Sequence, residues 1–484
     1  MSRGQRPQSG LEAFCELERF LARSATARLG LRAVEVQTER RGREVLRLAL
    51  QAHLDARGDG DLGAALVLDG PEGPVRLSHK RAHTRRLLTV FGEVSITRVG
   101  YGACHQPSIH PLDASLSLPA RTYSYECQRR LVRAAVCGPF DEAVATLAEM
   151  TGVVVPKRSA EQVVIDAATD FEAFYLSRDR QAARPARGEI LVGAVDCKGI
   201  PMVKRAPAAK VVRRGKGEKA NKKKMATVAA VFSQAPYIRT PAEVLDSLFA
   251  ISEAPRPRQP RRRPTAKRVW ASLLAGKENF ISDVRAEMIR RDPRHRRTWV
   301  MVTDGERALQ RRVAASFRGV TLVLDLLHVM EKLWKAAYVL HPEGSPEAET
   351  FVRQRAERIL NGQVSQVVKG LRQMVTKRGL TGTKAKILRD VAGYYYANRG
   401  RMAYDEYLAK GWPIASGAVE GACKNLIRDR FERSGMRWTP PMAEAMLRLR
   451  AVYLSAQFDE YWEFHVQQEQ QRLHSKRPWR VVRK

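Results

Sequence analysis

Two apolar segments each lead into an aspartate, and the type and placement of these two aspartates point to metal chemistry. Residues 190–195 (Ile-Leu-Val-Gly-Ala-Val) precede Asp196, and residues 299–303 (Trp-Val-Met-Val-Thr) precede Asp304. An uninterrupted run of this kind is typical of a strand covered on both faces of an α/β sheet. We expect each strand to end at its aspartate, at the sheet edge where α/β proteins bind ligands. Paired carboxylates there favour Mg²⁺ or Mn²⁺, although either residue alone is equally typical of a loop or helix cap.

The chain is strongly basic. Its 484 residues include 85 Lys and Arg against 51 Asp and Glu, a formal net charge of +34. Such an excess favours a polyanionic partner, through phosphate contacts and counterion release. The basic residues are spread along the whole chain, which indicates a long nucleic-acid track. A ribosome-like structural protein, a protein that binds anionic membranes and a member of an arginine-rich proteome would carry a similar charge.

Composition argues against several classes of protein. A chain of 484 residues with 44% hydrophobic content is long enough for about two to four folded domains. No stretch reaches the roughly 20 uncharged apolar residues that span a bilayer, and residues 1–10 are too polar for a signal peptide. Six cysteines without a C-x-x-C pair argue against a disulfide scaffold and a thiolate zinc site. We therefore expect a cytoplasmic protein.

The first 185 residues are predicted to be mainly helical. Residues 11–57 predict two helices and residues 85–101 a β-hairpin around Gly92. Three more helices are predicted at 126–135, at 140–150 and from Ser159, which Gln162 would complete as a capping box. Helix, glycine-containing turn and helix outline a helix-turn-helix DNA reader, although many three-helix bundles share the outline. Because such readers contact DNA through the start of the last helix, Arg158 and Gln162 are the expected contacts.

The elements that position the two aspartates are predicted to form a mixed sheet. Other strands are expected at 198–203, 225–232 and 320–325, and helices at 267–291 and 306–317. A basic segment, 204–224, separates two of the strands, and we expect its Lys222, Lys223 and Lys224 to touch DNA rather than to form a merely solvated loop. Residues 329–412 are predicted to be nearly all helical, and a last helix is expected from Pro441 to about His474.

With these elements in order, the chain resembles bacterial insertion-sequence DDE transposases, in particular the ISKra-type group related to Mutator-like elements. The resemblance covers nearly the whole chain and rests on four motifs, at residues 194–199, 302–306, 325–328 and 416–438. It departs from the family at Cys197, where many relatives have Gly. It implies an α/β multidomain protein with a ribonuclease-H-like (RNase H-like) core, interrupted by an all-helical insertion and preceded by a helix-turn-helix-like region.

The resemblance also implies the chemistry. Asp196, Asp304 and Glu420 would be the catalytic carboxylates and would hold two Mg²⁺ (or Mn²⁺) ions between them. Paired divalent ions can activate an attacking oxygen and stabilise a leaving one at phosphorus. Water would first cut the transposon end, and the freed 3′-hydroxyl would then attack target DNA. The alternative for Glu420 is a solvated carboxylate at a helix start, which the helix dipole favours.

Accessory residues follow from the same motifs. Asp325 and His328 match the C/D-x-x-H signature of the wider group, although a single His after an apolar run is most often a hydrogen-bonded core residue. Lys424, Arg430 and Arg437 would clamp DNA phosphates, or form a plain basic surface.

The full prediction is a five-part chain: an N-terminal α+β region (1–118), a helix-turn-helix-like DNA-binding region (119–185), the first part of an RNase H-like core (186–328), an all-helical insertion (329–412), and the completion of the core (413–484). Its expected partners are the terminal repeats and the target, both double-stranded DNA, with the chain oligomerising on DNA in a bacterial, nucleoid-associated setting. A catalytically inactive DNA-binding regulator and a metal-dependent nuclease without strand transfer are the alternatives.

Overall fold

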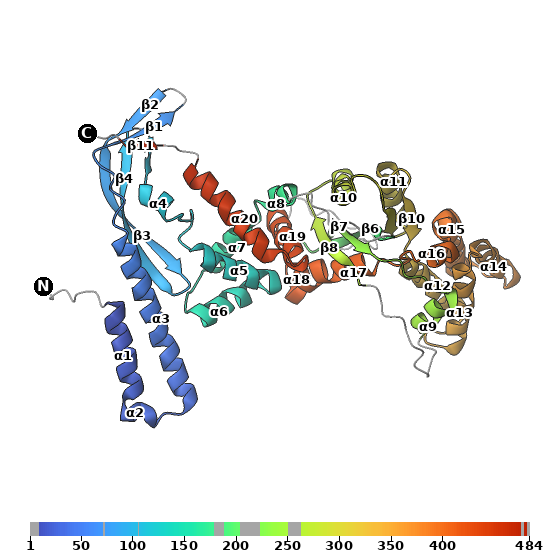
Figure 1. Ribbon diagram of the computed structural model, residues 1–484. Coiled ribbons are helices and arrows are strands. Elements are labelled where there is room, and N and C mark those ends of the chain that lie inside the picture. Colours follow the sequence, from blue (N-terminus) through green and yellow to red (C-terminus); the bar gives the residue numbers. More distant parts are fainter. Residues whose placement is uncertain are drawn as a thin grey trace, which may run out of the picture. The chain divides into compact units, whose positions relative to one another are not determined.

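The structure is a computed structural model that describes residues 9–70, 73–104, 106–178, 188–203, 223–249, 263–475 and 479–481 (Figure 1). The chain divides into two compact units, residues 1–176 with 458–484 and residues 177–457. Each unit combines helices with strands, so the protein has a mixed α/β architecture with several sheets. Among the described residues, no helix combines the length and the apolar character that crossing a membrane requires.

The first unit contains α1 (Gly10–Ala22), α2 (Ser24–Ala27), α3 (Leu31–Ala56), β1 (Leu66–Gly70), β2 (Gly73–Leu77), β3 (His79–Thr89), β4 (Gly92–Ala103), β5 (Gln106–Ile109), α4 (Pro111–Ser115), α5 (Tyr125–Cys137), α6 (Phe140–Thr151), α7 (Lys157–Ala167), α8 (Phe171–Ser177), α20 (Phe458–Gln470), the π-helical turn η4 (Gln471–Ser475) and β11 (Trp479–Val481). Its strands form two antiparallel sheets, β11-β1-β2 and β3-β4-β5. The predicted helices within 11–57 and the hairpin around Gly92 are confirmed.

The three helices expected between residues 120 and 170 are α5, α6 and α7, but the predicted start of the last one is wrong. Helix α7 begins at Lys157, and Pro156, not Ser159, precedes its first residue. Proline suits this place because its fixed φ fits a helix start and it has no N–H to leave unpaired. Ser159 therefore lies inside the first turn, where it caps nothing.

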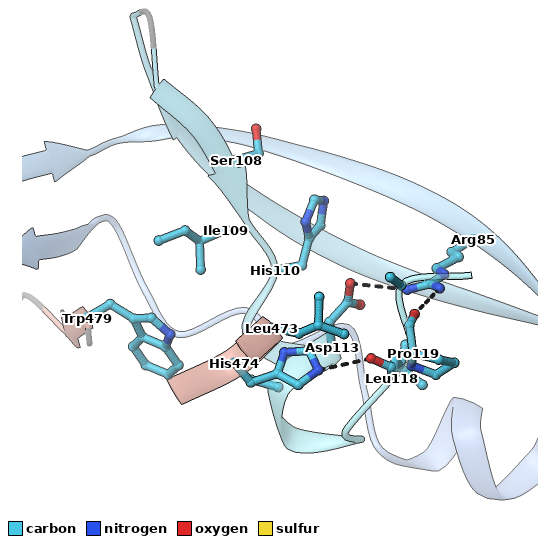
Figure 2. Close-up of a pocket in the computed structure, with 12 residues that line it drawn as sticks. Arg85, Ser108, Ile109, His110, Asp113, Leu118, Pro119, Leu473, His474 and Trp479 are labelled. Carbon is cyan, nitrogen blue, oxygen red and sulfur yellow. Dashed lines mark hydrogen bonds and ion pairs between the residues drawn. The ribbon is translucent and has the colours of Figure 1, made fainter. Parts of the chain in front are cut away.

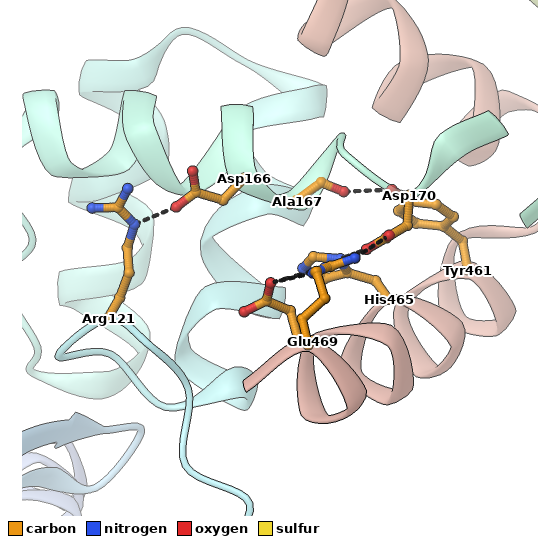
Figure 3. Close-up of polar contacts among 8 residues, drawn as sticks. Arg121, Asp166, Ala167, Asp170, Tyr461, His465 and Glu469 are labelled. Carbon is orange, nitrogen blue, oxygen red and sulfur yellow. Dashed lines mark hydrogen bonds and ion pairs between the residues drawn. The ribbon is translucent and has the colours of Figure 1, made fainter. Parts of the chain in front are cut away.

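The C-terminal helix α20 is fastened to the segment that follows α7 (Figure 3). The Tyr461 hydroxyl donates to the Ala167 carbonyl at 2.5 Å, and His465 Nδ1 lies 2.7 Å from Asp170 Oδ2. Arg472 donates to both oxygens of Asp170, at 2.5 and 2.8 Å. Burial raises the pKa of Asp170, but Arg472 and His465 outweigh burial and leave that pKa lowered. These contacts explain why residues 458–484 belong to the first unit.

The single C-terminal helix expected from Pro441 is in fact two helices. Helix α19 (Pro440–Leu454) ends before Ala456, whose φ of 56° is left-handed, and α20 begins at Phe458. A left-handed residue interrupts the α-helical hydrogen-bond ladder, so the chain changes direction there. The five predicted segments as such stay a prediction, because each compact unit combines several of them.

The second unit contains β6 (Ile190–Ile200), β7 (Lys224–Gln234), α9 (Pro241–Phe249), β8 (Thr265–Ser272), α10 (Lys277–Arg291), β9 (Thr298–Thr303), α11 (Arg307–Ser316), β10 (Thr321–Leu324), α12 (Leu326–Leu340), α13 (Pro346–Leu360), α14 (Val364–Lys377), α15 (Gly382–Asn398), η1 (Arg399–Arg401), α16 (Tyr404–Ala409), α17 (Gly417–Ala422), the π-helical turn η2 (Cys423–Arg428), α18 (Asp429–Phe431), η3 (Arg433–Gly435) and α19. Its sheet has the order β10-β9-β6-β7-β8. Strand β9 is parallel to β10 and β6, whereas β7 is antiparallel to β6 and β8.

Two predictions for this sheet are wrong. Strand β6 does not end at Asp196 but continues to Ile200, because β7 pairs with it over its whole length. The strands predicted at 190–196 and 198–203 are thus one strand. The first part of the helix predicted at 267–291 is strand β8, which pairs with β7, and α10 begins only after Gly276. The helical content predicted for residues 329–412 is confirmed by α12 to α16.

Candidate active site

Strand β6 fixes Asp196 from both faces of the sheet. Residues 190–195 are buried, and Asp196 is the first partly exposed side chain of the strand. Gly193 permits this close packing: a Cβ there would lie 2.3 Å from Met301 Sδ and 2.9 Å from Met288 Sδ. Asp196 therefore emerges from a rigid, dry support.

Asp304 directly follows β9, as the sequence predicts, on the strand parallel to β6. Its Oδ1 accepts the Glu306 N–H at 3.1 Å, and its carbonyl accepts Gln310 Nε2 at 2.9 Å. Burial, followed by the negative charge of Asp196, raises the pKa of Asp304. The structure thus brings Asp196 and Asp304 within electrostatic reach of each other.

Cys423 contacts Asp196, which the sequence analysis missed. The Cys423 thiol donates to Asp196 Oδ2 at 3.2 Å, while the Cys197 N–H donates to Oδ1 at 2.6 Å. Burial and the charge of Asp196 raise the pKa of Cys423, so the thiol stays protonated. Cys423 opens the π-helical turn η2, a rare conformation found frequently at functional sites.

Glu420 lies outside this pair. It is exposed on α17, three residues and thus about one helical turn before Cys423. Throughout the described ranges, no group of three or more His, Cys, Asp or Glu side chains is arranged to hold a metal ion. Two of the three predicted carboxylates are therefore together, and Glu420 is close to them along its helix without joining them.

The Asp325–His328 motif borders the carboxylate pair. Asp325 is buried, accepts the Leu327 N–H at 2.8 Å as cap of α12, and accepts the Ser416 hydroxyl. His328 Nδ1 lies 3.4 Å from Asp325 Oδ2. Asp325 raises the pKa of His328, and Asp304 and Asp196 add to that effect. Asp325 is thus committed to structural contacts, while His328 faces all three carboxylates with its basicity increased.

Tyr394, from the helical segment, lies beside Asp304. A Cβ at Gly305 would lie 2.1 Å from both Cε2 and the hydroxyl of Tyr394, so the ring occupies the space a side chain would need. Burial, then the charges of Asp304 and Asp325, raises the pKa of Tyr394. Lys332 Nζ lies 5.7 Å from the ring centroid. The only sequence signal was a run of three tyrosines, and no spacing linked it to Asp304.

The predicted phosphate contacts of the second unit have different fates. Lys222 lies outside the described residues, and Lys223 forms an ion pair with Glu432 at 2.5 Å. Lys224, Lys424 and Arg437 are exposed, as a phosphate contact requires.

The predicted phosphate contact of Arg430 requires correction. This side chain is 0% exposed, and its guanidinium carbon lies 4.8 Å from the Trp438 ring centroid. Its Nη1 is 3.3 Å from Met436 Sδ. Arg430 therefore supports the turn after η2 from within the core, which its charge alone did not indicate.

Of the two predicted base contacts on α7, Arg158 is the better placed. Both Arg158 and Gln162 are exposed, but Gln162 donates to Asp166 at 3.1 Å, and Asp166 also pairs with Arg121 (Figure 3). Lys157 is paired with Asp141 at 2.7 Å. Arg158 therefore carries the expected DNA contact, whereas Gln162 would have to leave its partner.

A cavity of about 180 Å³ lies in the first unit, away from every predicted site residue (Figure 2). The C-terminal residues close it, with His474 Nε2 3.0 Å from the Leu118 carbonyl. Arg85 is occupied by the carbonyls of Pro119 and Arg121, at 2.5 and 2.7 Å. We interpret the cavity as a gap left by this closure.

The donor set at the carboxylate pair fits a divalent cation that prefers oxygen. Asp196 and Asp304 supply hard carboxylate oxygens, the ligands of Mg²⁺ and Mn²⁺. The neighbouring Cys423 thiol is held protonated, so it is a hydrogen-bond donor rather than a thiolate ligand.

Comparison with known proteins gives little beyond this geometry. No protein-family model matches the chain, and no curated protein matches it at a significant level. Solved structures that match include the Drosophila P element transposase strand transfer complex, at 9% identity and a TM-score of 0.23, over 70% of this chain and 80% of that one. A likeness this distant carries no conclusion about activity, so function is inferred from the residues.

Proposed function

We propose that the chain is a DNA transposase that binds the ends of an insertion sequence and cuts and joins DNA strands with divalent cations. The observation that carries the proposal is the pair Asp196 and Asp304 on the adjacent parallel strands β6 and β9. The strand order β10-β9-β6-β7-β8, with only β7 antiparallel to its neighbours, is the order expected of an RNase H-like core. The basic charge of +34 supports DNA as the substrate.

Each residue near the pair has a proposed task. Asp196 and Asp304 hold the cations, which supply activation of the attacking oxygen and stabilisation of the leaving one. His328, with its raised pKa, presents positive charge to a phosphate at the pair, and the Tyr394 hydroxyl offers a second donor. Glu420 completes the site when DNA binding turns its side chain toward Asp196, on which the neighbouring Cys423 already rests.

One observation favours a second candidate, a DNA-binding regulator without catalytic activity. Glu420 is outside the pair, and the described residues contain no three-ligand metal group. Such a protein would bind DNA through the same basic surface and would not cut it.

Cleavage of end-labelled DNA by matched variants separates the two candidates. We expect Asp196→Asn, Asp304→Asn and Glu420→Gln each to abolish Mg²⁺-dependent cleavage and to leave DNA affinity within about threefold, because the basic contacts remain. Glu347→Gln, an exposed carboxyl on α13, is the control and should cut normally. Binding without cleavage by the unmodified chain would favour the regulator, and normal cleavage by any one carboxylate variant would remove that residue from the site.

A further inference from the structure

The helical hairpin formed by α1, α2 and α3 is poorly buried. Of the 26 residues of α3, only Leu48 is buried, and α1 buries only Ala13 and Phe20. In proteins, most helical stability comes from packing an apolar face against other elements. The C-terminal part of α3 has such support, since Gln51 hydrogen-bonds Ser95 of β4, but the rest of the hairpin packs mainly on itself.

Helix α1 is apolar on two opposite sides. Ala13 and Phe20 face α3. Leu11, Phe14 and Leu21 form a second stripe at helical spacing, with exposed fractions of 73%, 45% and 44%. A stripe of this kind in water is typical of a surface that binds another protein.

The hairpin differs from the rest of the chain in composition. Seven of the 21 exposed large hydrophobic residues of the described structure lie in or next to its helices: Leu11, Phe14, Leu21, Leu29, Leu31, Val36 and Leu46. Residues 10–56 contain 8 Arg and 7 Asp or Glu, a net charge of +1, whereas the whole chain carries +34. A nearly neutral, apolar surface is poorly suited to DNA and well suited to a protein partner.

We propose that this hairpin pairs with the hairpin of a second copy of the chain, in a four-helix contact that forms without DNA. Charge complementarity selects the second copy: Glu16 and Glu18 are exposed on α1, and Arg32 and Arg40 are exposed on α3. A two-fold contact uses the same surface on both copies. Laying α1 of each copy on α3 of the other buries both apolar stripes and opposes acids to bases in both halves. The pairing does not depend on the proposed transposase activity.

Sedimentation equilibrium of the full chain tests the contact. The protein is treated with nuclease and held at about 0.5 M salt, so that DNA does not bridge two copies. We expect the unmodified chain to sediment at twice its monomer mass. Leu11→Glu and Phe14→Glu should each raise the dimer dissociation constant at least about tenfold. Ile238→Glu, at an equally exposed position (67%) in the second unit, is the matched control and should leave it unchanged.

A charge exchange tests the partner. Glu18→Arg should weaken the dimer, and adding Arg32→Glu should restore it, because each reversed charge meets its complement in the other copy. Unchanged circular dichroism excludes misfolding as the cause. A chain that is monomeric at about 10 µM, a dimer unaffected by Leu11→Glu, or a double variant no tighter than Glu18→Arg alone would each overturn the proposed pairing.

Discussion

Asp170 offers the sharpest test of how the first unit is held together. Its carboxylate is 4% exposed and receives three contacts, two from Arg472 at 2.5 and 2.8 Å and one from His465 at 2.7 Å. Replacing Asp170 by Asn leaves both partners without their counter-charge. Breaking a buried pair costs about 3–5 kcal/mol, and we expect the lower end because the Arg472 side chain is 33% exposed and also contacts Glu469.

For a unit of about 200 residues, about 3 kcal/mol corresponds to a fall in Tm of roughly 6–12 °C. Differential scanning calorimetry of the full chain measures this fall. Asp459→Asn is the control: it lies on the same helix and pairs with Arg129 at 3.0 Å, but its side chain is 70% exposed, so its loss should cost under about 1 kcal/mol.

The lowered pKa of Asp170 also fixes the pH dependence. A carboxyl whose pKa is lower in the folded than in the unfolded state contributes stability above the unfolded value, about 3.9, and loses it as pH falls through the folded value. The difference between the unmodified chain and Asp170→Asn should therefore be full at pH 6 to 7 and shrink below about pH 4. Equal Tm values for Asp170→Asn and Asp459→Asn at neutral pH would refute this account of the clasp.

Three further outcomes follow from the structure. Gly193→Ala should lower stability by about 1–3 kcal/mol in urea unfolding, because its Cβ would meet Met301, whereas Gly370→Ala, with open space around it, should not. Arg430→Ala should destabilise the chain by about 3 kcal/mol, while Arg437→Ala should change stability by under about 0.5 kcal/mol and weaken DNA binding instead; the reverse pattern would contradict the burial of Arg430. DNA affinity should fall with a log–log salt slope of about −0.9 per phosphate neutralised, and a flat slope would mean that the basic surface is not the binding face.

The sequence predicted the strands better than their ends. The buried runs before Asp196 and Asp304 were visible because a strand covered on both faces is continuously apolar. The continuation of β6 past Asp196 was not visible, because Lys198 and Gly199 are ordinary strand ends and only pairing with β7 makes them strand. Strand β8 was hidden for a related reason: its Lys and Arg residues suit a helix equally well, and pairing with β7 decides.

The surroundings of the carboxylates depend on contacts between distant segments. Cys423 lies 227 residues after Asp196, and no local pattern links them. Arg430 was predicted to touch DNA from its charge, and only the packing of Trp438 around it shows that it is buried. Likewise, a fragment that ends at residue 185 would lack Tyr461 and His465, so tests of the helix-turn-helix region require the full chain.

The most direct test of the central claim is strand joining. A precut DNA end with a free 3′-hydroxyl, taken from the native flanking repeats, is incubated with the protein, Mg²⁺ and a supercoiled plasmid, and covalently joined product is measured. We predict joined product with the unmodified chain, its loss with Asp304→Asn or with EDTA, and unchanged product with Glu347→Gln. Plasmid nicking without joining would leave only a nuclease, and product that persists in EDTA or with Asp304→Asn would contradict a metal-dependent site at Asp196 and Asp304.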